Sequence, residues 1–176
     1  MNELSLHQIK IFFQDQLIQN LILSKREAVI EFNQILQFIF KMDYSKLLSQ
    51  SPQITKKQLK QIEKIINLRI KGTPLAYIFK EWDFYGRKFF LNKSCLIPRP
   101  DTETLVELAL EAPFETVLDL GTGSGCILLS LLAERPGATG LGTDISADAL
   151  QIAQENAARL GVAGADFVQS DWFAEV

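Results

Sequence analysis

A short glycine-rich segment carries the strongest chemical signal in this chain. Asp119-Leu-Gly121-Thr-Gly123-Ser-Gly125 follows the apolar run TVLDL and precedes the apolar run CILLSLLAE. Glycine allows sharp turns and close approach of the backbone to a ligand, and a helix N-terminus offers free N–H groups. The loop formed by Gly121, Thr122, Gly123, Ser124 and Gly125 is therefore predicted to bind a nucleotide-like ligand.

Three kinds of nucleotide site could use such a loop. A phosphate-binding P-loop needs Gly-Lys-Ser/Thr at its end, which is absent here. A dinucleotide fingerprint needs glycine at its first, third and sixth positions, but the sixth position from Gly121 is Cys126, and from Gly123 it is Leu128. That alternative is weakened and stays open. The pattern Asp-x-Gly-x-Gly-x-Gly instead resembles the first motif of Rossmann-like methyltransferases that use S-adenosylmethionine.

Acidic and aromatic residues follow the next two predicted strands. Asp144 ends the run ATGLGTD, where a carboxylate can accept hydrogen bonds from both hydroxyls of a ribose. Asp171 ends ADFVQSD, where its carboxylate suits an adenine amino group. Trp172 follows it, and its aromatic ring suits an adenine face. Each residue alone is more often a cap, turn or core residue. Their combination with the glycine loop favours S-adenosylmethionine as the cofactor.

Strands and helices alternate in the region that positions these residues. We expect FETVLDL to be a buried strand, GCILLSLLAE a helix, ATGLGTD and ADFVQSD two more strands, and ADALQIAQENAARL a helix capped by Ser146 and ended by Gly161. TETLVELALEA should be a helix with Asp101 or Thr102 as its N-cap. This order predicts right-handed βαβ units and a parallel sheet with helices on its faces.

The first 70 residues have a different pattern. Leu6, Ile9, Phe13 and Leu17 recur with the period of a helical face, and further helices are predicted over residues 25–40 and 55–71. Residues 76–97 are aromatic and β-branched with a turn near Tyr85-Gly86, which indicates a β-hairpin. The expected fold class is α/β, with a helical domain (1–75) for substrate recognition, a β-hairpin linker (76–97) and an incomplete Rossmann-like methyltransferase domain (98–176).

Composition and charge exclude several other classes. Of the 176 residues, 47% are hydrophobic, and no apolar run reaches the length of a membrane span. One histidine and two distant cysteines offer no metal-ligand spacing and no disulfide framework, so we expect no metal and a reduced, cytoplasmic setting. Residues 1–90 carry a net charge of +6 and residues 91–176 one of −9. Since no basic cluster is dense, we expect no nucleic-acid partner. We also expect a monomer.

A second motif precedes the glycine loop. Residues 97–103 read IPRPDTE, and together with GTPLAYIFKEWDFYG, VLDLGTGSG and SDWF they resemble the glutamine-N5 methyltransferases that modify peptide chain release factors. The resemblance covers essentially the whole chain. It implies cofactor contacts at Gly121 to Gly125, Asp144 and Trp172, and a substrate glutamine in the Gly-Gly-Gln motif of a release factor. Lys80 stands where the family usually has glycine, which implies a local adjustment of the turn.

The same resemblance implies where catalysis would occur. In the family an Asn-Pro-Pro-Tyr motif orients the substrate amide nitrogen, and that motif is absent from these 176 residues. We therefore assign no catalytic residue, and expect an N-terminal part that is inactive alone, with IPRPDTE forming one wall of the substrate site. Two alternatives stay open: a non-catalytic module that binds a release factor or cofactor, and another nucleotide-dependent Rossmann enzyme such as a dehydrogenase.

Overall fold

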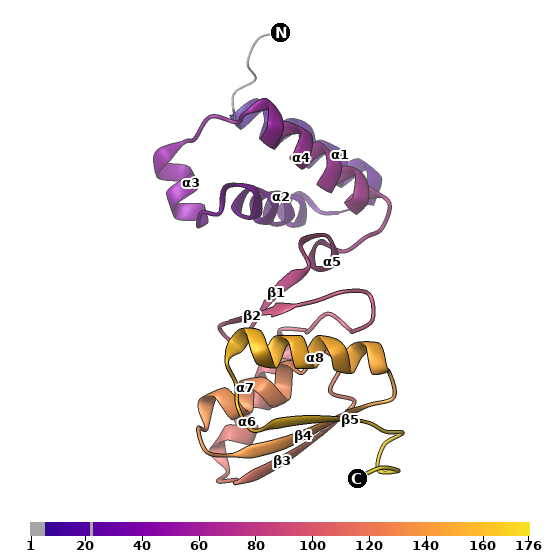
Figure 1. Cartoon of the computed structure of the whole chain (residues 1–176). Helices are drawn as coiled ribbons and strands as arrows, with labels where there is room; N and C mark the ends of the chain where they lie inside the picture. Colours follow the sequence, from indigo (N-terminus) through magenta and orange to yellow (C-terminus); the bar gives the residue numbers. More distant parts are fainter. Residues whose placement is uncertain (1–5, 22) are drawn as a thin grey trace. The chain divides into compact units, whose positions relative to one another are not determined.

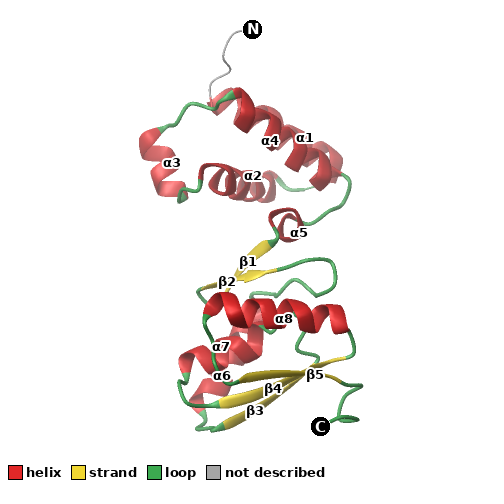
Figure 2. Cartoon of the chain, viewed as in Figure 1, coloured by secondary structure: helices red, strands yellow, loops and turns green. Residues whose placement is uncertain are grey.

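The computed structural model describes residues 6–21 and 23–176, and the chain forms two compact units, residues 1–79 and 80–176 (Figures 1 and 2). The first unit is helical. The second contains the hairpin, a parallel sheet and three helices. Among the described residues, none of the helices is long and apolar enough to cross a membrane. That same part of the chain holds no group of three or more His, Cys, Asp or Glu side chains arranged to bind a metal ion.

The described residues of the first unit form five helices, and three of them were predicted. They are α1 (Leu6–Leu21), α2 (Lys25–Phe40), α3 (Tyr44–Gln50), α4 (Lys56–Ile70) and α5 (Leu75–Phe79). The predicted face of α1 is confirmed at Ile9, Phe13 and Leu17, which are buried, while the side chain of Leu6 lies outside the described residues. The short helices α3 and α5 were not predicted, because neither is long enough to show a helical period.

Local capping defines where α2 and α4 begin. The Ser24 hydroxyl accepts the Glu27 N–H, and the Glu27 carboxylate accepts the Ser24 N–H at 2.8 Å. Thr55 and Gln58 make the same reciprocal pair at the start of α4. Such capping boxes satisfy N–H groups that the first helical turn leaves without intrahelical partners. They explain why both helices begin close to the residues that the sequence pattern predicts.

The core of the first unit joins α1, α2 and α4. The rings of Phe13 and Phe32 stack at 6.0 Å between α1 and α2. The guanidinium of Arg69 in α4 donates two hydrogen bonds of 2.9 Å to the carboxylate of Glu31 in α2. This bidentate pair is largely shielded from solvent, so it fixes the two helices in register as well as in distance.

The predicted β-hairpin is confirmed, but it is shorter than expected. Strands β1 (Glu81–Phe84) and β2 (Arg87–Phe90) pair antiparallel, and Tyr85 and Gly86 form the turn with φ of 47° and 69°. Positive φ at both turn residues gives the twist that a two-residue hairpin requires. Residues 76–79 are helical instead of extended. Lys80 joins that helix to β1 with a φ of 59°, so this lysine adopts a conformation that favours glycine.

The second unit contains a three-stranded parallel sheet, as predicted. Its strands are β3 (Thr116–Leu120), β4 (Thr139–Asp144) and β5 (Ala165–Gln169), in the order β3-β4-β5. Its helices are α6 (Asp101–Glu111), α7 (Cys126–Glu134) and α8 (Ala147–Leu160). Both ends of α8 were predicted correctly: the Ser146 hydroxyl accepts the Ala149 N–H, and Gly161 ends the helix in a left-handed conformation.

All three of these helices lie on one side of the sheet, whereas we expected helices on both faces (Figure 1). Two right-handed crossovers that proceed in the same direction, from β3 to β4 to β5, place both connecting helices on the same face. Close packing on that face requires a glycine in β4, because a Cβ on Gly140 would lie 2.5 Å from Leu128 of α7. The opposite face is more open. Leu118 there is 40% exposed, so the prediction that β3 is buried was wrong.

The start of α6 also differs from the prediction. Asp101 is the first helical residue and Pro100 precedes it, so neither Asp101 nor Thr102 is the N-cap, and no side chain caps the helix. The Glu103 carboxylate instead accepts the backbone N–H of Tyr85 at 2.9 Å. This bond ties α6 to the hairpin turn. Glu103 is thereby used in a contact between elements, which local sequence pattern does not reveal.

Candidate functional site

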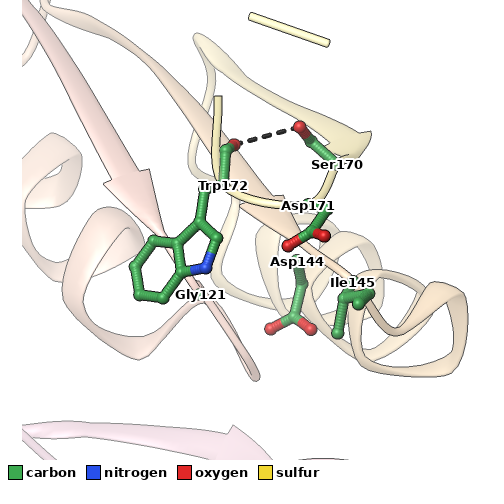
Figure 3. A pocket seen from close by; sticks show the side chains of 6 residues that line it. All are labelled: Gly121, Asp144, Ile145, Ser170, Asp171 and Trp172. Atoms are coloured by element: carbon green, nitrogen blue, oxygen red, sulfur yellow. Dashed lines mark hydrogen bonds between the residues drawn. The ribbon is translucent and has the colours of Figure 1, made fainter. Parts of the chain in front are cut away.

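The predicted site residues come together because β3, β4 and β5 are parallel neighbours. The carboxyl ends of parallel strands lie at one edge of a sheet, and ligands of open α/β sheets bind there. A hollow of about 210 Å³ at this edge is lined by Gly121, Asp144, Ile145, Ser170, Asp171 and Trp172 (Figure 3). Four of these six residues were predicted from sequence. Ile145 and Ser170 were not, although each adjoins a predicted residue at a strand end.

The glycine loop turns sharply at the end of β3. Gly121, Gly123 and Gly125 have φ of 75°, 57° and 78°, which side chains rarely adopt. The N–H groups of Gly121 and Thr122 both donate to the carbonyl of Thr143 in β4, each at 2.8 Å. A Cβ at Gly121 would meet nothing within 4 Å. The loop therefore presents open backbone next to the hollow.

The remaining loop residues have other roles. A Cβ on Gly125 would lie 3.0 Å from a Leu129 methyl and 3.2 Å from the Ala153 Cβ, so this glycine permits the close packing of α7 and α8. Thr122 and Ser124 are 5% and 2% exposed. Contacts that these two residues make with a ligand would have to come from their backbone. None of Thr122 to Gly125 lines the hollow itself.

Asp144 is a second residue of β4, after Thr143, that connects the loop to this strand. Its Oδ2 accepts the Gly123 N–H and its Oδ1 accepts the Ser146 N–H, both at 2.9 Å. A carboxylate has about four lone-pair sites, so each oxygen keeps a site for one more donor. Two backbone bonds thus hold the carboxylate in place while it can still accept two further hydrogen bonds. This dual arrangement suits a pair of neighbouring hydroxyl groups.

Asp119, in β3, contacts the loop through a side-chain hydrogen bond. The Thr122 hydroxyl donates to the Asp119 carboxylate at 2.7 Å. Burial raises the pKa of Asp119, and the hydrogen bond from Thr122 opposes that shift. Asp119 belongs to the motif Asp-x-Gly-x-Gly-x-Gly, yet it does not line the hollow. Its contacts are with Thr122 of the loop and the backbone of Leu128 in α7.

The third strand end supplies the other side of the hollow. The Ser170 N–H donates to the Asp144 carbonyl at 3.1 Å, and the Ser170 hydroxyl donates to the Trp172 carbonyl at 3.0 Å. Trp172 has a φ of 54° and is 68% exposed. Figure 3 shows the indole and the carboxylates of Asp144 and Asp171 around the same hollow. An aromatic face and two carboxylates are thus available to a ligand.

The segment IPRPDTE lies outside this hollow. No residue of 97–103 contributes to its lining, and both Arg99 and Pro100 are exposed. In the preceding segment, burial raises the pKa of the Cys95 thiol, and the charge of Asp144 adds to that shift. Of the site that the sequence predicts, the structure therefore brings together the strand ends but does not bring IPRPDTE to them.

Comparison with known proteins agrees with the two-unit division of the chain. A family described as PrmC N-terminal domain matches residues 17–79, and one described as Methyltransferase domain matches residues 113–176. A solved ribosomal protein L11 methylase from Lactobacillus delbrueckii subsp. bulgaricus is 33% identical, with a TM-score of 0.39, over 44% of this chain and 42% of that chain. That likeness is partial.

Release factor glutamine methyltransferases are among the curated relatives. The protein from Cereibacter sphaeroides is 43% identical over 85% of this chain and 55% of its own length. The protein from Nitratidesulfovibrio vulgaris is 52% identical over 56% of this chain and 35% of its own. The Escherichia coli protein is 40% identical over 69% of this chain and 45% of its own length. The chain spans about half the length of the curated relatives it matches. By sequence, the chain matches release factor glutamine methyltransferases over most of its own length.

Proposed function

We propose that this chain binds S-adenosylmethionine at the carboxyl edge of its sheet and belongs to a protein that methylates a release factor. The observation that carries the proposal is the hydrogen bonding of Asp144. Its carboxylate is held by the N–H groups of Gly123 and Ser146 and retains one acceptor site on each oxygen. That pair of sites matches the two hydroxyls of a ribose.

Other features of the hollow fit the remaining parts of the cofactor. Gly121 has open space where a side chain would stand, so a ligand can approach the backbone there. The exposed indole of Trp172 offers an apolar face for an adenine ring, and Asp171 beside it offers an acceptor for an exocyclic amino group. When bound, S-adenosylmethionine would supply a methyl group attached to a positively charged sulfur. This chain's own residues would bind and orient it.

The substrate class follows from the relatives. Their names specify a release factor glutamine, and the helical unit matches the N-terminal domain of the same family. We assign substrate recognition to that unit and the Gly-Gly-Gln glutamine as the target. Transfer to an amide nitrogen needs a group that orients it, and no Asn-Pro-Pro-Tyr motif occurs in these residues. We therefore expect this chain to bind the cofactor without transferring the methyl group.

Calorimetric titration tests cofactor binding directly. S-adenosylmethionine and its product S-adenosylhomocysteine should bind one site per chain, and NAD should not compete. Preferential binding of NAD would refute the methyltransferase assignment and favour a dehydrogenase. A release factor incubated with S-adenosylmethionine and this chain should stay unmethylated by mass spectrometry. The Escherichia coli relative, used in parallel, provides the positive control.

A further inference from the structure

A buried asparagine in α8 makes contacts with two other segments, and the proposed function does not explain these contacts. Asn156 is 0% exposed. Its Oδ1 accepts the Phe90 N–H at 2.7 Å, and its Nδ2 donates to the Phe90 carbonyl at 3.1 Å and to the Ser124 carbonyl at 2.9 Å. Both donor hydrogens of the amide are thus used, together with its oxygen. A buried polar group that is fully satisfied in this way specifies one arrangement of its neighbours.

The two partner residues come from distant parts of the second unit. Phe90 ends β2 of the hairpin, and Ser124 lies within the glycine loop, 66 and 32 residues from Asn156 in sequence. Toward Phe90 the amide pairs with both backbone groups, as a neighbouring strand would. Toward Ser124 it holds a carbonyl that lies between Gly123 and Gly125. The same side chain therefore fixes the hairpin and the loop to α8.

We propose that Asn156 is a positioning residue for the cofactor loop, which rests on the proposed function of that loop. Three glycines with positive φ give the loop many alternative conformations in the absence of restraints. The bond to the Ser124 carbonyl restrains the peptide plane between Ser124 and Gly125. The adjacent Gly123 N–H then meets Asp144 at 2.9 Å. A loop ordered before binding loses less conformational entropy when the ligand binds.

The requirement is for the amide and not merely for a side chain of its size. Asn156→Asp is nearly isosteric and retains an oxygen that can accept the Phe90 N–H. Its second oxygen would replace the donor that meets the Phe90 and Ser124 carbonyls. Asn156→Ser is smaller and removes the bridge without introducing a charge. The two variants therefore remove the same contact by different means, which keeps the test informative if Asn156→Asp fails to fold.

A matched control is Arg135, which follows the C-terminal end of α7, whereas the glycine loop precedes its N-terminal end. Arg135 donates to the carbonyls of Ala112 and Leu110 at 2.7 and 2.9 Å and stacks on Phe114. Arg135→Ala should destabilise the same unit, but it removes contacts with Ala112, Leu110 and Phe114 and none with the loop. With α7 running from Cys126 to Glu134, this site is about 13 Å along the helix axis from the loop. The control separates a loss of stability from a loss of loop position.

The experiment measures affinity for S-adenosylhomocysteine and backbone hydrogen exchange in peptides covering residues 119–126. We expect Asn156→Ser to weaken binding about tenfold and to speed exchange in the loop. Arg135→Ala should alter affinity less than twofold and leave loop exchange unchanged at a comparable loss of stability. Loop exchange in Asn156→Ser that equals that of Arg135→Ala would overturn the proposal, whatever the affinities. If wild type does not bind the probe while Asn156→Ser still speeds loop exchange, the positioning role stands and the proposed function fails.

Discussion

Substitution of Asp144 by asparagine tests how the candidate site is held together. In the wild type, each carboxylate oxygen accepts one backbone N–H, from Gly123 or from Ser146. The asparagine amide has one oxygen and one NH₂ group, so only one of those N–H groups can keep its acceptor. The other N–H would face a donor. The change therefore alters the contacts within the site with almost no change in side-chain volume.

The structure sets the size of the expected loss of stability. A hydrogen bond to a charged group contributes about 1.5–3 kcal/mol, and the lower end applies because Asp144 is only half-buried. We expect Asp144→Asn to lower the free energy of unfolding of the second unit by about 1.5 kcal/mol. For a domain of roughly 100 residues this corresponds to a fall in Tm of about 6–12 °C.

Cofactor affinity should fall as well. The substitution removes one of the two acceptor sites proposed for the ribose hydroxyls and the negative charge behind the other. A loss of about 1.5–3 kcal/mol in binding corresponds to roughly a 10- to 150-fold rise in Kd for S-adenosylhomocysteine. Asp144→Ala removes both acceptors, so it should weaken binding further, to below detection by titration.

Tryptophan fluorescence follows the unfolding of the correct unit. Both tryptophans of the chain, Trp82 and Trp172, lie within residues 80–176. Asp166→Asn serves as a control, since Asp166 is exposed on β5 and loses the same charge. The reasoning would be refuted if Asp144→Asn matched Asp166→Asn in both unfolding midpoint and affinity. Loss of affinity without loss of stability would show that Asp144 contacts the ligand but does not hold the loop.

Three other perturbations test the packing and the titration of the second unit. Gly140→Ala places a Cβ 2.5 Å from Leu128. Overpacking of this kind should lower the free energy of unfolding, measured by urea titration, by about 1–3 kcal/mol. An unchanged urea midpoint would show that α7 does not pack closely against Gly140. Lys80→Gly removes the strain of a side chain at a φ of 59°, but glycine also loses more conformational entropy on folding. The net effect should be a free energy of unfolding that is higher by about 0.5 kcal/mol. A clear decrease would show that the turn at Lys80 is not strained. Burial raises the pKa of the Cys126 thiol from its ordinary 9.0 to about 11. The unfolded chain therefore releases this proton first, and stability should fall as pH rises from 9 to 11, with a smaller slope in Cys126→Ala.

Local signals account for the parts of the fold that the sequence predicts well. Helix α8 has a serine cap at one end and a left-handed glycine at the other, and both act within a few residues of the helix. The turn at Tyr85-Gly86 and the three alternating strands have equally local signatures. Gly121, Asp144, Asp171 and Trp172 were found in the same way, because strand ends in βαβ units meet at one edge.

The errors arose where contacts between distant residues decide the outcome. Glu103 lies in the first turn of α6, and no local pattern indicates that its carboxylate accepts the N–H of Tyr85. No local pattern distinguishes Asn156, yet it is buried and bridges two other segments. Leu118 belongs to FETVLDL, which was expected to be a buried strand. Its exposure depends on which face the helices cover, and sequence period alone does not specify that face.

The separation into two units has a consequence for the kinetics of folding. Capping boxes at Ser24 and Thr55 stabilise helices through contacts only three residues apart, so order in the first unit can form locally. The second unit must instead pair parallel strands such as Thr116–Leu120 and Thr139–Asp144 across a connecting helix. Closing such loops is slow relative to forming helices. Refolding after dilution from denaturant should therefore recover helical circular dichroism before the fluorescence of Trp82 and Trp172.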